Sequence, residues 1–315
     1  MSKNIALMDK FGEKFTEGDN FKHYAIGFLD RGCNVVQLDP HTINFKEGIA
    51  NVYGLTLEKN NVFVRSNKKK VGELKSYDVL MDLSDVVDFN FAMDLDKVNT
   101  LHINPPIATY NSADKKTYIR NYLEVIPKTI VSSEISELEE ALYNEFGGEM
   151  VVKNPFGSCG RDIERVDIHN PNYRKVLEEI TNGEKEKIIA QKFITFAYEG
   201  GKRVAVLGDI KRPESYKIIH FYRRKPSKGN WKDNLSQGGE VIELDSLRED
   251  EMELCLNVAR KSGLYAVGLD IMDDSDEAGK RVSRLVETNA VLALAFGRYP
   301  EKLKEVTDFI LEELI

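Results

Sequence analysis

The chain has few cysteines and no cysteine motif. The three of them, Cys33, Cys159 and Cys255, lie far apart without CxxC spacing. This spacing suggests neither a disulfide framework nor a zinc site, and a reducing cytoplasm fits it best. No GxSxG or HExxH motif is present, and the histidines His102 and His220 lie in strand-like segments without triad partners. We interpret both histidines as structural.

Long apolar runs are absent as well. No run approaches the roughly 20 residues that a membrane-spanning helix needs. The first 15 residues contain Asp9 and Glu13 where a secretory signal would carry its apolar segment. The formal net charge is −8, which argues against non-specific binding of nucleic acid. We therefore expect a soluble cytoplasmic protein with no membrane and no nucleic-acid partner.

What the chain does contain is enough apolar material for a sizeable core. It has 315 residues, of which 42% are hydrophobic and 30% charged. Residues 4–8 and 33–38 are short apolar strands, and the segment 21–31 between them is typical of an amphipathic helix. This βαβ opening predicts a parallel sheet covered by helices, continued by a hairpin over 52–65 and strands at 78–83 and 100–103.

Composition changes after about residue 110. Segments 115–123, 135–146 and 170–182 are predicted helices, with strands at 130–132, 149–153 and 163–166. From residue 188 the strands are longer, and the helices 247–261 and 300–314 accompany them. The fold class is therefore α/β with an α+β central unit. We expect three units, at residues 1–110, 111–188 and 189–315.

The first candidate site follows a strand that ends in Lys153. A loop with Gly157, Ser158 and Gly160 comes next and leads into another strand. Such a loop can fold its backbone N–H groups around phosphates, while the lysine adds a point charge. An ordinary hairpin turn with an exposed lysine is the alternative, and taken alone this motif favours it.

The second candidate is a metal site on two apolar strands. One strand carries Asp270 and the other carries Glu287 and Asn289, which alternation places on the same face. Carboxylate and amide oxygens suit one or two magnesium ions that bridge phosphates. The alternative is that these groups lie at strand ends in solvent. A carboxylate between Leu269 and Ile271 is costly unless it is paired, so metal binding is favoured.

Cations gather in one part of this acidic chain. They include Arg203 and Arg224, which could neutralise phosphate charge or bind a substrate carboxylate, although exposed hairpin charge is the alternative and, taken alone, this series favours it. A polar loop containing Asn234, over residues 233–239, could close on a ligand or serve as a linker. The run 190–194 is ordinary strand by itself.

In order and spacing these segments resemble the ATP-grasp superfamily, and nearest within it the bacterial-type glutathione synthetases. Lys116, followed by Pro127 and Thr129, is similar to the lysine and Pro-x-Thr of that family. The motif K-x-x-x-G-x-x-G corresponds to Lys153, Gly157 and Gly160. Further matches are the hinge at 190–194, the run 201–204, Arg224 with Pro226, Asn234 to Gly239, Gly268 with Asp270, and Glu287 with Asn289.

The resemblance implies an ATP-grasp fold with an N-terminal pre-ATP-grasp domain, and a ligase that joins a carboxylate to an amine through an acyl phosphate. It implies ATP and Mg²⁺ as cofactors, with two ions and Mn²⁺ as a substitute, and a homo-oligomer, dimer or tetramer. The implied nucleotide ligands are Lys116, Lys153, Gly157, Ser158, Gly160, Gln191, Lys192, Phe193 and Ile194. The implied metal ligands are Asp270, Glu287 and Asn289, and the implied catalytic residues are Arg203, Arg224 and Asn234.

The chain departs from this pattern where the family binds its peptide substrate. The Arg-Lys-Asp expected after the third strand is replaced by residues 81–85, with Asp82 and Asp85. The Thr-Ser-Pro expected after Asn289 is replaced by the apolar run 290–295. Residues 157–161 and 230–234 look more like glutamate ligases that modify ribosomal protein and α-aminoadipate ligases. Substrates other than those of glutathione synthesis are expected, with a ligase for a protein or peptide terminus, or a non-catalytic ATP-binding subunit, as alternatives.

Overall fold

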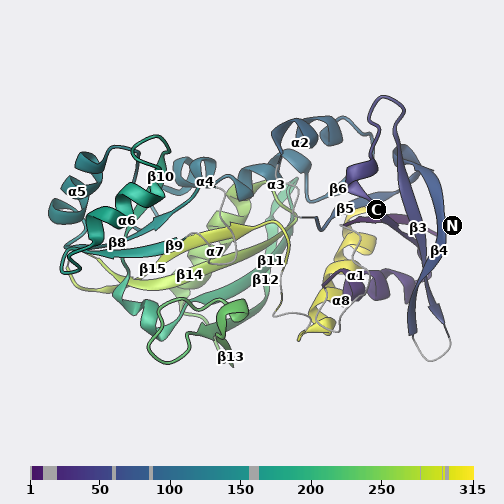
Figure 1. The fold of residues 1–315 in the computed structure, drawn as a ribbon. Coiled ribbons are helices and arrows are strands. Elements are labelled where there is room, and N and C mark those ends of the chain that lie inside the picture. Colours follow the sequence, from purple (N-terminus) through teal and green to yellow (C-terminus); the bar gives the residue numbers. More distant parts are fainter. Residues whose placement is uncertain are drawn as a thin grey trace.

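The chain folds into three separate sheets, each with its own helices (Figure 1). This computed structural model describes residues 2–9, 20–58, 62–84, 88–155, 163–276, 278–292, 294 and 298–315. None of the helices that it describes has the length and apolar composition to span a lipid bilayer. The expected α/β class is confirmed.

The N-terminal sheet has the strand order β4-β3-β2-β1-β5-β6 and is parallel at its centre. β1, β2, β5 and β6 run parallel, while β3 and β4 form the predicted antiparallel hairpin at one edge. The helix α1 follows β1, as the βαβ pattern predicts. The bounds are β1 Asn4–Met8, α1 Asn20–Leu29, β2 Asn34–Leu38, β3 Ile49–Glu58, β4 Val62–Glu73, β5 Val79–Asp82, α2 Phe89–Asp96 and β6 Leu101–Ile103.

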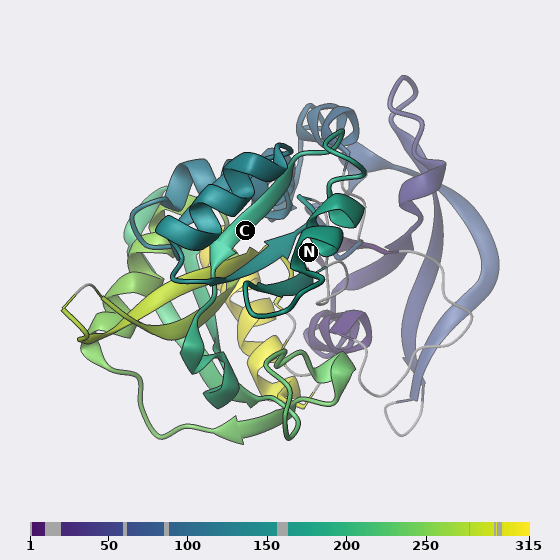
Figure 2. The ribbon, with the colours of Figure 1, turned by 60° about the vertical axis from the view of Figure 1, so that its left-hand side comes forward.

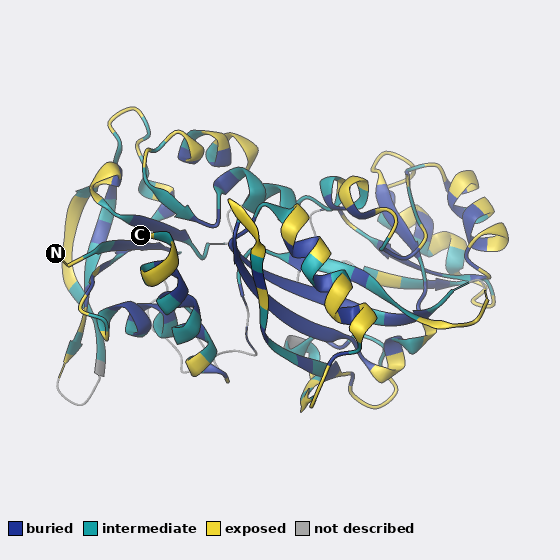
Figure 3. Cartoon of the chain, turned by 180° about the vertical axis from the view of Figure 1, so that it is seen from behind, coloured by how far each residue is buried: buried dark blue, intermediate teal, exposed yellow. Residues whose placement is uncertain are grey.

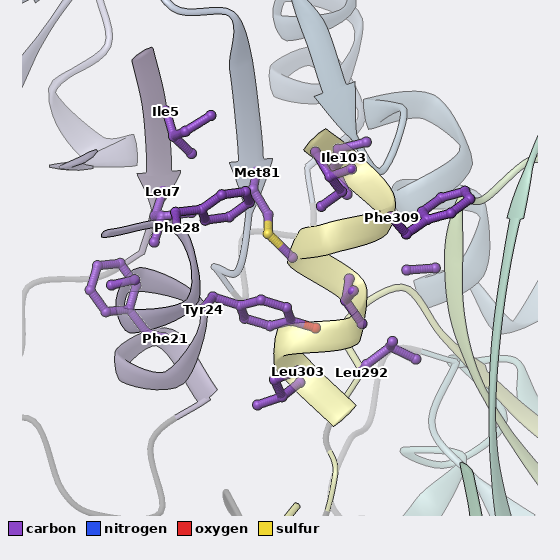
Figure 4. Close-up of a cluster of buried hydrophobic side chains, with 14 of the residues drawn as sticks. Ile5, Leu7, Phe21, Tyr24, Phe28, Met81, Ile103, Leu292, Leu303 and Phe309 are labelled. Carbon is purple, nitrogen blue, oxygen red and sulfur yellow. The ribbon is translucent and has the colours of Figure 1, made fainter. Parts of the chain in front are cut away.

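The C-terminal helix α8 (Pro300–Phe309) returns to the N-terminal sheet. The sequence assigns this segment to the third unit, but its apolar face packs against α1. Figure 4 shows the Tyr24 ring of α1 against α8, and Phe309 on the opposite side of α8; Tyr24, Phe28, Leu303 and Phe309 are all buried in one core cluster. The close approach is allowed because the Cα of Gly27 lies against Thr307, where a Cβ would come within 2.8 Å of the threonine Oγ1. Residues 298–315 therefore contact both the first unit, through α1, and the third, through Tyr299, whose ring centroid lies 4.0 Å from that of His220 and 5.7 Å from that of Tyr222.

The central unit is a four-stranded antiparallel sheet, in the order β7-β10-β8-β9, with α5 and α6 packed on it. Its last strand runs to Lys192, four residues beyond the predicted boundary. The segment between β8 and β9 lies outside the described residues. The bounds are β7 Thr129–Ser132, α5 Ile135–Asn144, β8 Glu149–Lys153, β9 Ile163–Asp167, α6 Tyr173–Ile180 and β10 Ile188–Lys192.

The C-terminal sheet has the order β13-β12-β11-β14-β15 and is antiparallel. Figure 3 shows its strands buried beneath a helix, α7, whose outer face is exposed. Figure 2 brings the central unit forward, in front of this sheet. The bounds are β11 Lys202–Asp209, β12 Arg212–Lys225, β13 Glu240–Glu243, α7 Glu249–Ser262, β14 Ala266–Ser275 and β15 Arg281–Asn289.

Two helices before the central sheet pack on the C-terminal sheet instead. They are α3 (Pro106–Ala113) and α4 (Lys115–Tyr122). Tyr118 and Tyr122 are buried in the core of the C-terminal unit, where the Tyr118 hydroxyl donates to the Leu285 carbonyl at 2.8 Å. The predicted boundary at residue 111 thus groups α4 with the wrong core, because the burial of its tyrosines is a tertiary contact.

Asn104 joins the first and third units. Its side chain is buried, with 4% exposed, and makes three hydrogen bonds. Its Nδ2 donates to the carbonyls of Ala266, at 2.7 Å, and Ala290, at 2.6 Å. Its Oδ1 accepts from the Ala266 amide at 2.9 Å. The side chain thereby connects the end of β6 to the start of β14 and the end of β15.

We expect Asn104→Ala to lower the free energy of unfolding by about 2–4 kcal/mol, because buried backbone groups lose their partners. Urea unfolding measures this change, and Asn99→Ala, at an exposed position nearby, is the matched control. A loss equal to that of the control would contradict the role assigned to Asn104.

Candidate functional site

A pocket of about 880 Å³, part of it open to solvent, lies between the central and C-terminal units. Strands from both sheets and the loop before β13 contribute to it. Its lining includes most of the residues that the sequence singles out, and several that it does not. The lining residues are Lys115, Pro127, Val151, Lys153, Ile163, Gln191, Lys192, Phe193, Ile194, Ala197, Arg224, Trp231, Lys232, Asp233, Asn234, Asp270, Met272, Val286 and Glu287.

One part of the pocket is apolar. Val151, Phe193 and Ala197 form a small buried cluster, against which Ile163, Trp231 and Met272 pack. The rings of Phe193 and Trp231 meet edge to face, with centroids 5.7 Å apart. Four of the five residues of the predicted hinge, Gln191 to Ile194, line the pocket. An apolar wall of this kind suits a flat heterocyclic base.

Lys153 ends β8 and extends into the pocket. Its Nζ donates to Gln191 Oε1 at 2.5 Å, and Gln191 Nε2 donates to Thr129 Oγ1 at 2.9 Å. Loss of water around the ammonium lowers the pKa of Lys153 to about 8, with a smaller lowering by the Lys115 charge and an opposing effect of Glu287 included in that value. An anion bound beside the ammonium would raise the pKa of Lys153 again and keep it protonated, so the site favours phosphate.

We expect ADP to bind more weakly as the pH rises above about 8, by up to tenfold per pH unit. The sign follows from the lowered pKa, because free Lys153 loses its proton there while bound phosphate holds it. Calorimetric titration between about pH 7.5 and 9.5 measures this dependence. Lys153→Arg keeps its charge throughout and should flatten the profile. An unchanged slope in that variant would contradict the assignment.

The structure places Lys115, and not Lys116, at the pocket. The predicted phosphate ligand Lys116 is exposed on α4, while Lys115 is largely buried and its Nζ lies 3.7 Å from Glu287 Oε1. The side chains of neighbouring residues on a helix point about 100° apart. When one of them faces the pocket, the next can therefore face the solvent. We therefore replace Lys116 by Lys115 as the candidate.

Two carboxylates face each other across β14 and β15. Asp270 pairs directly with Glu287, and a β-bulge follows, since Ile271 pairs with Leu285. The bulge turns both Val286 and Glu287 toward the pocket. Asn289 pairs with Gly268 two residues along the ladder, and its Nδ2 donates to the Gly268 carbonyl at 3.3 Å.

These groups fit a magnesium ion that shares its ligands with a phosphate. Among the described residues, no group of three or more His, Cys, Asp or Glu side chains could hold a metal alone. Mg²⁺ typically takes one or two carboxylates and completes its shell with water and substrate phosphates. Asp270 and Glu287, with the amide oxygen of Asn289 nearby, offer that oxygen-only set, and Lys115 and Lys153 lie beside it.

Two arginines, Arg203 and Arg224, contact the Asp270 carboxylate. Arg203 Nε and Arg224 Nη2 lie 3.1 and 3.2 Å from Asp270 Oδ1, and all three side chains are buried. Burial alone would lower the pKa of Arg224, but the carboxylates of Asp270 and Asp233 raise it. Arg224 lines the pocket, while Arg203 packs above Gly268, where a Cβ would meet its Nη1 at 2.8 Å. Only a glycine leaves room for this guanidinium.

The polar loop after β12 also reaches the pocket, through Asp233 and Asn234. Asp233 Oδ2 accepts from the Gly201 amide at 2.8 Å, and burial raises the pKa of Asp233 against the effect of Arg224. The Asn234 carbonyl accepts from the amides of Gln237, at 2.9 Å, and Gly239, at 3.2 Å. The predicted catalytic residue Asn234 is thus at the pocket.

Some of the residues that the sequence singles out lie outside the described residues or away from the pocket. Gly157, Ser158 and Gly160 lie outside the described residues and stay predictions. Sequence reasoning assigned no role to Lys115 or Met272, and it treated Trp231 and Asp233 only as parts of the motif 230–234 and the loop 233–239. His102 and His220 lie away from the pocket, as expected of structural residues.

Comparison with known proteins agrees with this geometry. The family described as "Prokaryotic glutathione synthetase, ATP-grasp domain" matches residues 115–277, slightly more than half of the chain. The chain belongs to this family. The match runs from the pocket lysine on α4 to the end of β14 and so contains nearly all of the pocket lining, but it ends before Glu287.

Curated relatives are glutathione synthetases. That of Parasynechococcus marenigrum (strain WH8102) is 31% identical over 148 residues, which are 46% of this chain and 45% of the relative. The chain thus spans about half the length of this relative. The glutathione synthetase of Bradyrhizobium diazoefficiens is 24% identical over 290 residues, 87% of this chain and 88% of that protein.

Solved structures share the whole fold. A RimK domain ATP-grasp protein from Sphaerobacter thermophilus superposes with a TM-score of 0.66 and 15% identity, covering 98% of this chain and 99% of that one. D-alanyl-alanine synthetase A from Vibrio cholerae gives 0.61 and 13%, covering 99% of each chain. The ATP-grasp fold predicted from the sequence is therefore confirmed.

Proposed function

We propose that this protein is an ATP- and Mg²⁺-dependent ligase that joins a carboxylate to an amine. The observation that carries the proposal is the single pocket that joins an apolar wall for a base, two lysines and a facing pair of carboxylates. Family membership supports an ATP-dependent ligase, and the glutathione synthetases among the relatives support small-molecule substrates. The predicted homo-oligomer stays a prediction.

The proposed reaction has two steps. A substrate carboxylate oxygen attacks the γ-phosphorus of ATP, the bond to the β-phosphate oxygen breaks, and ADP leaves. The amine nitrogen then attacks the carbonyl carbon of the acyl phosphate, loses a proton and displaces inorganic phosphate. This chemistry needs charge neutralisation and in-line positioning more than covalent help from the protein.

The residues divide this work. Phe193 and Trp231 hold the base, while Lys115 and Lys153 hold phosphate oxygens. Mg²⁺ held by Asp270, Glu287 and Asn289 would neutralise the charge of the phosphates. Arg224, fixed by Asp270 and Asp233, presents a permanent positive charge toward the transferred phosphoryl group. Arg203 holds Asp270 in place from behind.

Phosphate release tests the proposal directly. The protein is incubated with ATP, Mg²⁺ and pairs drawn from amino acids, dipeptides and peptide termini, and product mass identifies the amide. Release of phosphate that requires both a carboxylate and an amine supports the ligase. ATP binding without release for any pair would favour the non-catalytic subunit instead.

Glutathione synthesis itself should be slow. We expect γ-glutamylcysteine and glycine to give a kcat/KM below about 10⁴ M⁻¹s⁻¹, the lower end of ordinary enzymes. A dipeptide with two carboxylates needs cationic partners, and the family's cations after the third strand are replaced by Asp82, which accepts from the Ser84 amide and hydroxyl, and by Asp85, outside the described residues. Steady-state kinetics with these two substrates gives the answer, and an ordinary efficiency would contradict it.

Two described residues of the apolar run after Asn289, Leu292 and Leu294, lie in the core. The sequence predicts that residues 290–295 receive an uncharged group or another subunit. Leu292 and Leu294 are instead buried in the core around α1 and α8, each 1% exposed. These two side chains are therefore not available to a substrate, and we expect substrate selection at other residues.

A further inference from the structure

Residues 193–201, which begin within the predicted hinge at 190–194, join the central sheet to the C-terminal sheet. We call residues 193–201 the hinge segment. It follows β10, contains the short 3₁₀ helix η3 (Thr195–Glu199) and leads into β11. Phe193, Ile194 and Ala197 of this segment line the pocket. The position of the hinge segment therefore decides where a bound base meets its apolar wall.

Arg165 of β9 holds this segment from the central sheet. Its guanidinium carbon lies 4.7 Å from the centre of the Phe193 ring. One nitrogen, Nη1, donates to the Tyr198 hydroxyl at 2.9 Å, and the other, Nη2, donates to Glu149 Oε1 of β8 at 2.5 Å. One arginine thus connects two strands of its own sheet with Phe193, before η3, and with Tyr198, near the end of η3.

Arg281 of β15 does the same from the C-terminal sheet. Its guanidinium carbon also lies 4.7 Å from an aromatic ring of the hinge segment, that of Phe196. Its Nη2 donates to Glu199 Oε2 at 2.9 Å and to Asp273 Oδ2 of β14 at 2.7 Å. Each arginine therefore stacks on one phenylalanine, binds one polar side chain of the hinge segment and is anchored by one carboxylate of its own sheet.

The anchor of Arg281 is rigid. Asp273 is 5% exposed and also accepts from Arg248 at 2.8 Å, while Lys202 lies 3.7 Å away and pairs with the buried Glu251. Burial alone would raise the pKa of Asp273, but the arginines that donate to it hold it at about 2. The carboxylate therefore stays charged over the whole working pH range.

The far end of the hinge segment is fixed by its glycines. Gly200 has φ of 87°, in the left-handed region, and a Cβ there would lie against the Arg224 carbonyl oxygen. The Gly201 carbonyl accepts from the Arg224 amide at 2.8 Å. Between this point and β10, the orientation of η3 depends on the side chains that contact it.

We infer that Arg165 and Arg281 are positioning residues, which hold the hinge segment between the two sheets so that the base-binding wall is formed before the nucleotide arrives. The inference rests on the proposed nucleotide site. Neither guanidinium needs to touch the ligand, since each acts through Phe193, Phe196 and η3. Loss of either contact releases one side of the segment, and the ligand must then order it on binding.

Comparing the affinity for ADP, which has a base, with that for a phosphate chain alone distinguishes a positioning role from a general disturbance of the fold. In Arg165→Met and Arg281→Met we expect ADP to bind about tenfold more weakly, because a charge-assisted contact network is lost. Inorganic tripolyphosphate, which has no base, should bind as in wild type. Arg174→Met is the matched control, since Arg174 on α6 is exposed and pairs with Glu139 and Glu178 away from the hinge segment.

The hinge-side partners provide milder variants that should fold. Tyr198→Phe removes the acceptor of Arg165, and Glu199→Gln weakens that of Arg281; both side chains are about half exposed. Calorimetry gives the affinities, and quenching of Trp231, the single tryptophan, gives a second reading. ADP affinity reduced in these variants, with tripolyphosphate unchanged, supports the inference.

Three results would overturn the inference, and they can be told apart. If wild type binds ADP and all four variants match the Arg174 control, the hinge contacts do not position the base. Equal weakening of ADP and tripolyphosphate would also reject the role, since the damage would then be general. If wild-type protein binds neither ligand, the proposed function fails, and the inference falls with it.

Discussion

Glu287→Gln should reduce Mg²⁺-dependent ATP turnover at least about 100-fold while the protein stays folded. The carboxylate lies opposite Asp270 in the sheet and beside Lys115, at the place where phosphate oxygens and a metal would meet. An amide keeps the size of the side chain but removes the charge that a hard cation requires. Lys115 then loses its counter-ion, which leaves a net positive charge that repels Mg²⁺.

Phosphate release at increasing Mg²⁺ measures this effect, and Glu124→Gln, which changes an exposed carboxylate paired with Lys261, is the control. Activity near the wild-type level in Glu287→Gln would reject the metal site. Asp270→Asn is a less clear test, although it should also abolish turnover. It leaves Arg203 and Arg224 with a neutral partner in a buried position, where loss of one member of an ion pair costs about 3–5 kcal/mol.

Local patterns in the sequence were sufficient for most elements and for much of the pocket. β1, α1 and β2 follow from two short apolar runs around an amphipathic helix, since each pattern has its own period. Asp270 was recognisable because a carboxylate inside an apolar strand needs a partner. Its partners are now seen to be Arg203 and Arg224, which the sequence also selected, although as ligands of phosphate.

What the sequence could not supply depends on contacts between distant segments. α8 is amphipathic wherever it packs, so its pattern does not say that α1 is its neighbour. The same is true of Leu292 and Leu294, whose apolar character fits a substrate, a subunit or a core. The pairs formed by Arg165 and Arg281 with the hinge segment join strands that are 28 or more residues away from it, and no local signal marks them.

Lys115 and Lys116 show this limit within a single turn of helix. Both follow Asp114, which caps α4 and accepts from the Lys116 amide at 3.2 Å, and either could be the lysine that opens the helix. The choice is made by Tyr118 and Tyr122, which are buried against the C-terminal sheet and so fix the rotation of α4. That rotation turns Lys115 toward Glu287 and leaves Lys116 exposed.

We therefore expect opposite results from two adjacent substitutions. Lys115→Met should raise the KM for ATP about 10- to 100-fold, the range for one charge-assisted hydrogen bond to phosphate, while Lys116→Met should stay within about twofold of wild type. Both variants lose one positive charge from the same helix, so a difference between them cannot come from net charge or helix propensity. Initial rates of phosphate release at varied ATP separate them. A large effect at Lys116 with none at Lys115 would restore the residue that sequence spacing predicts and would mean that α4 rotates when the nucleotide binds.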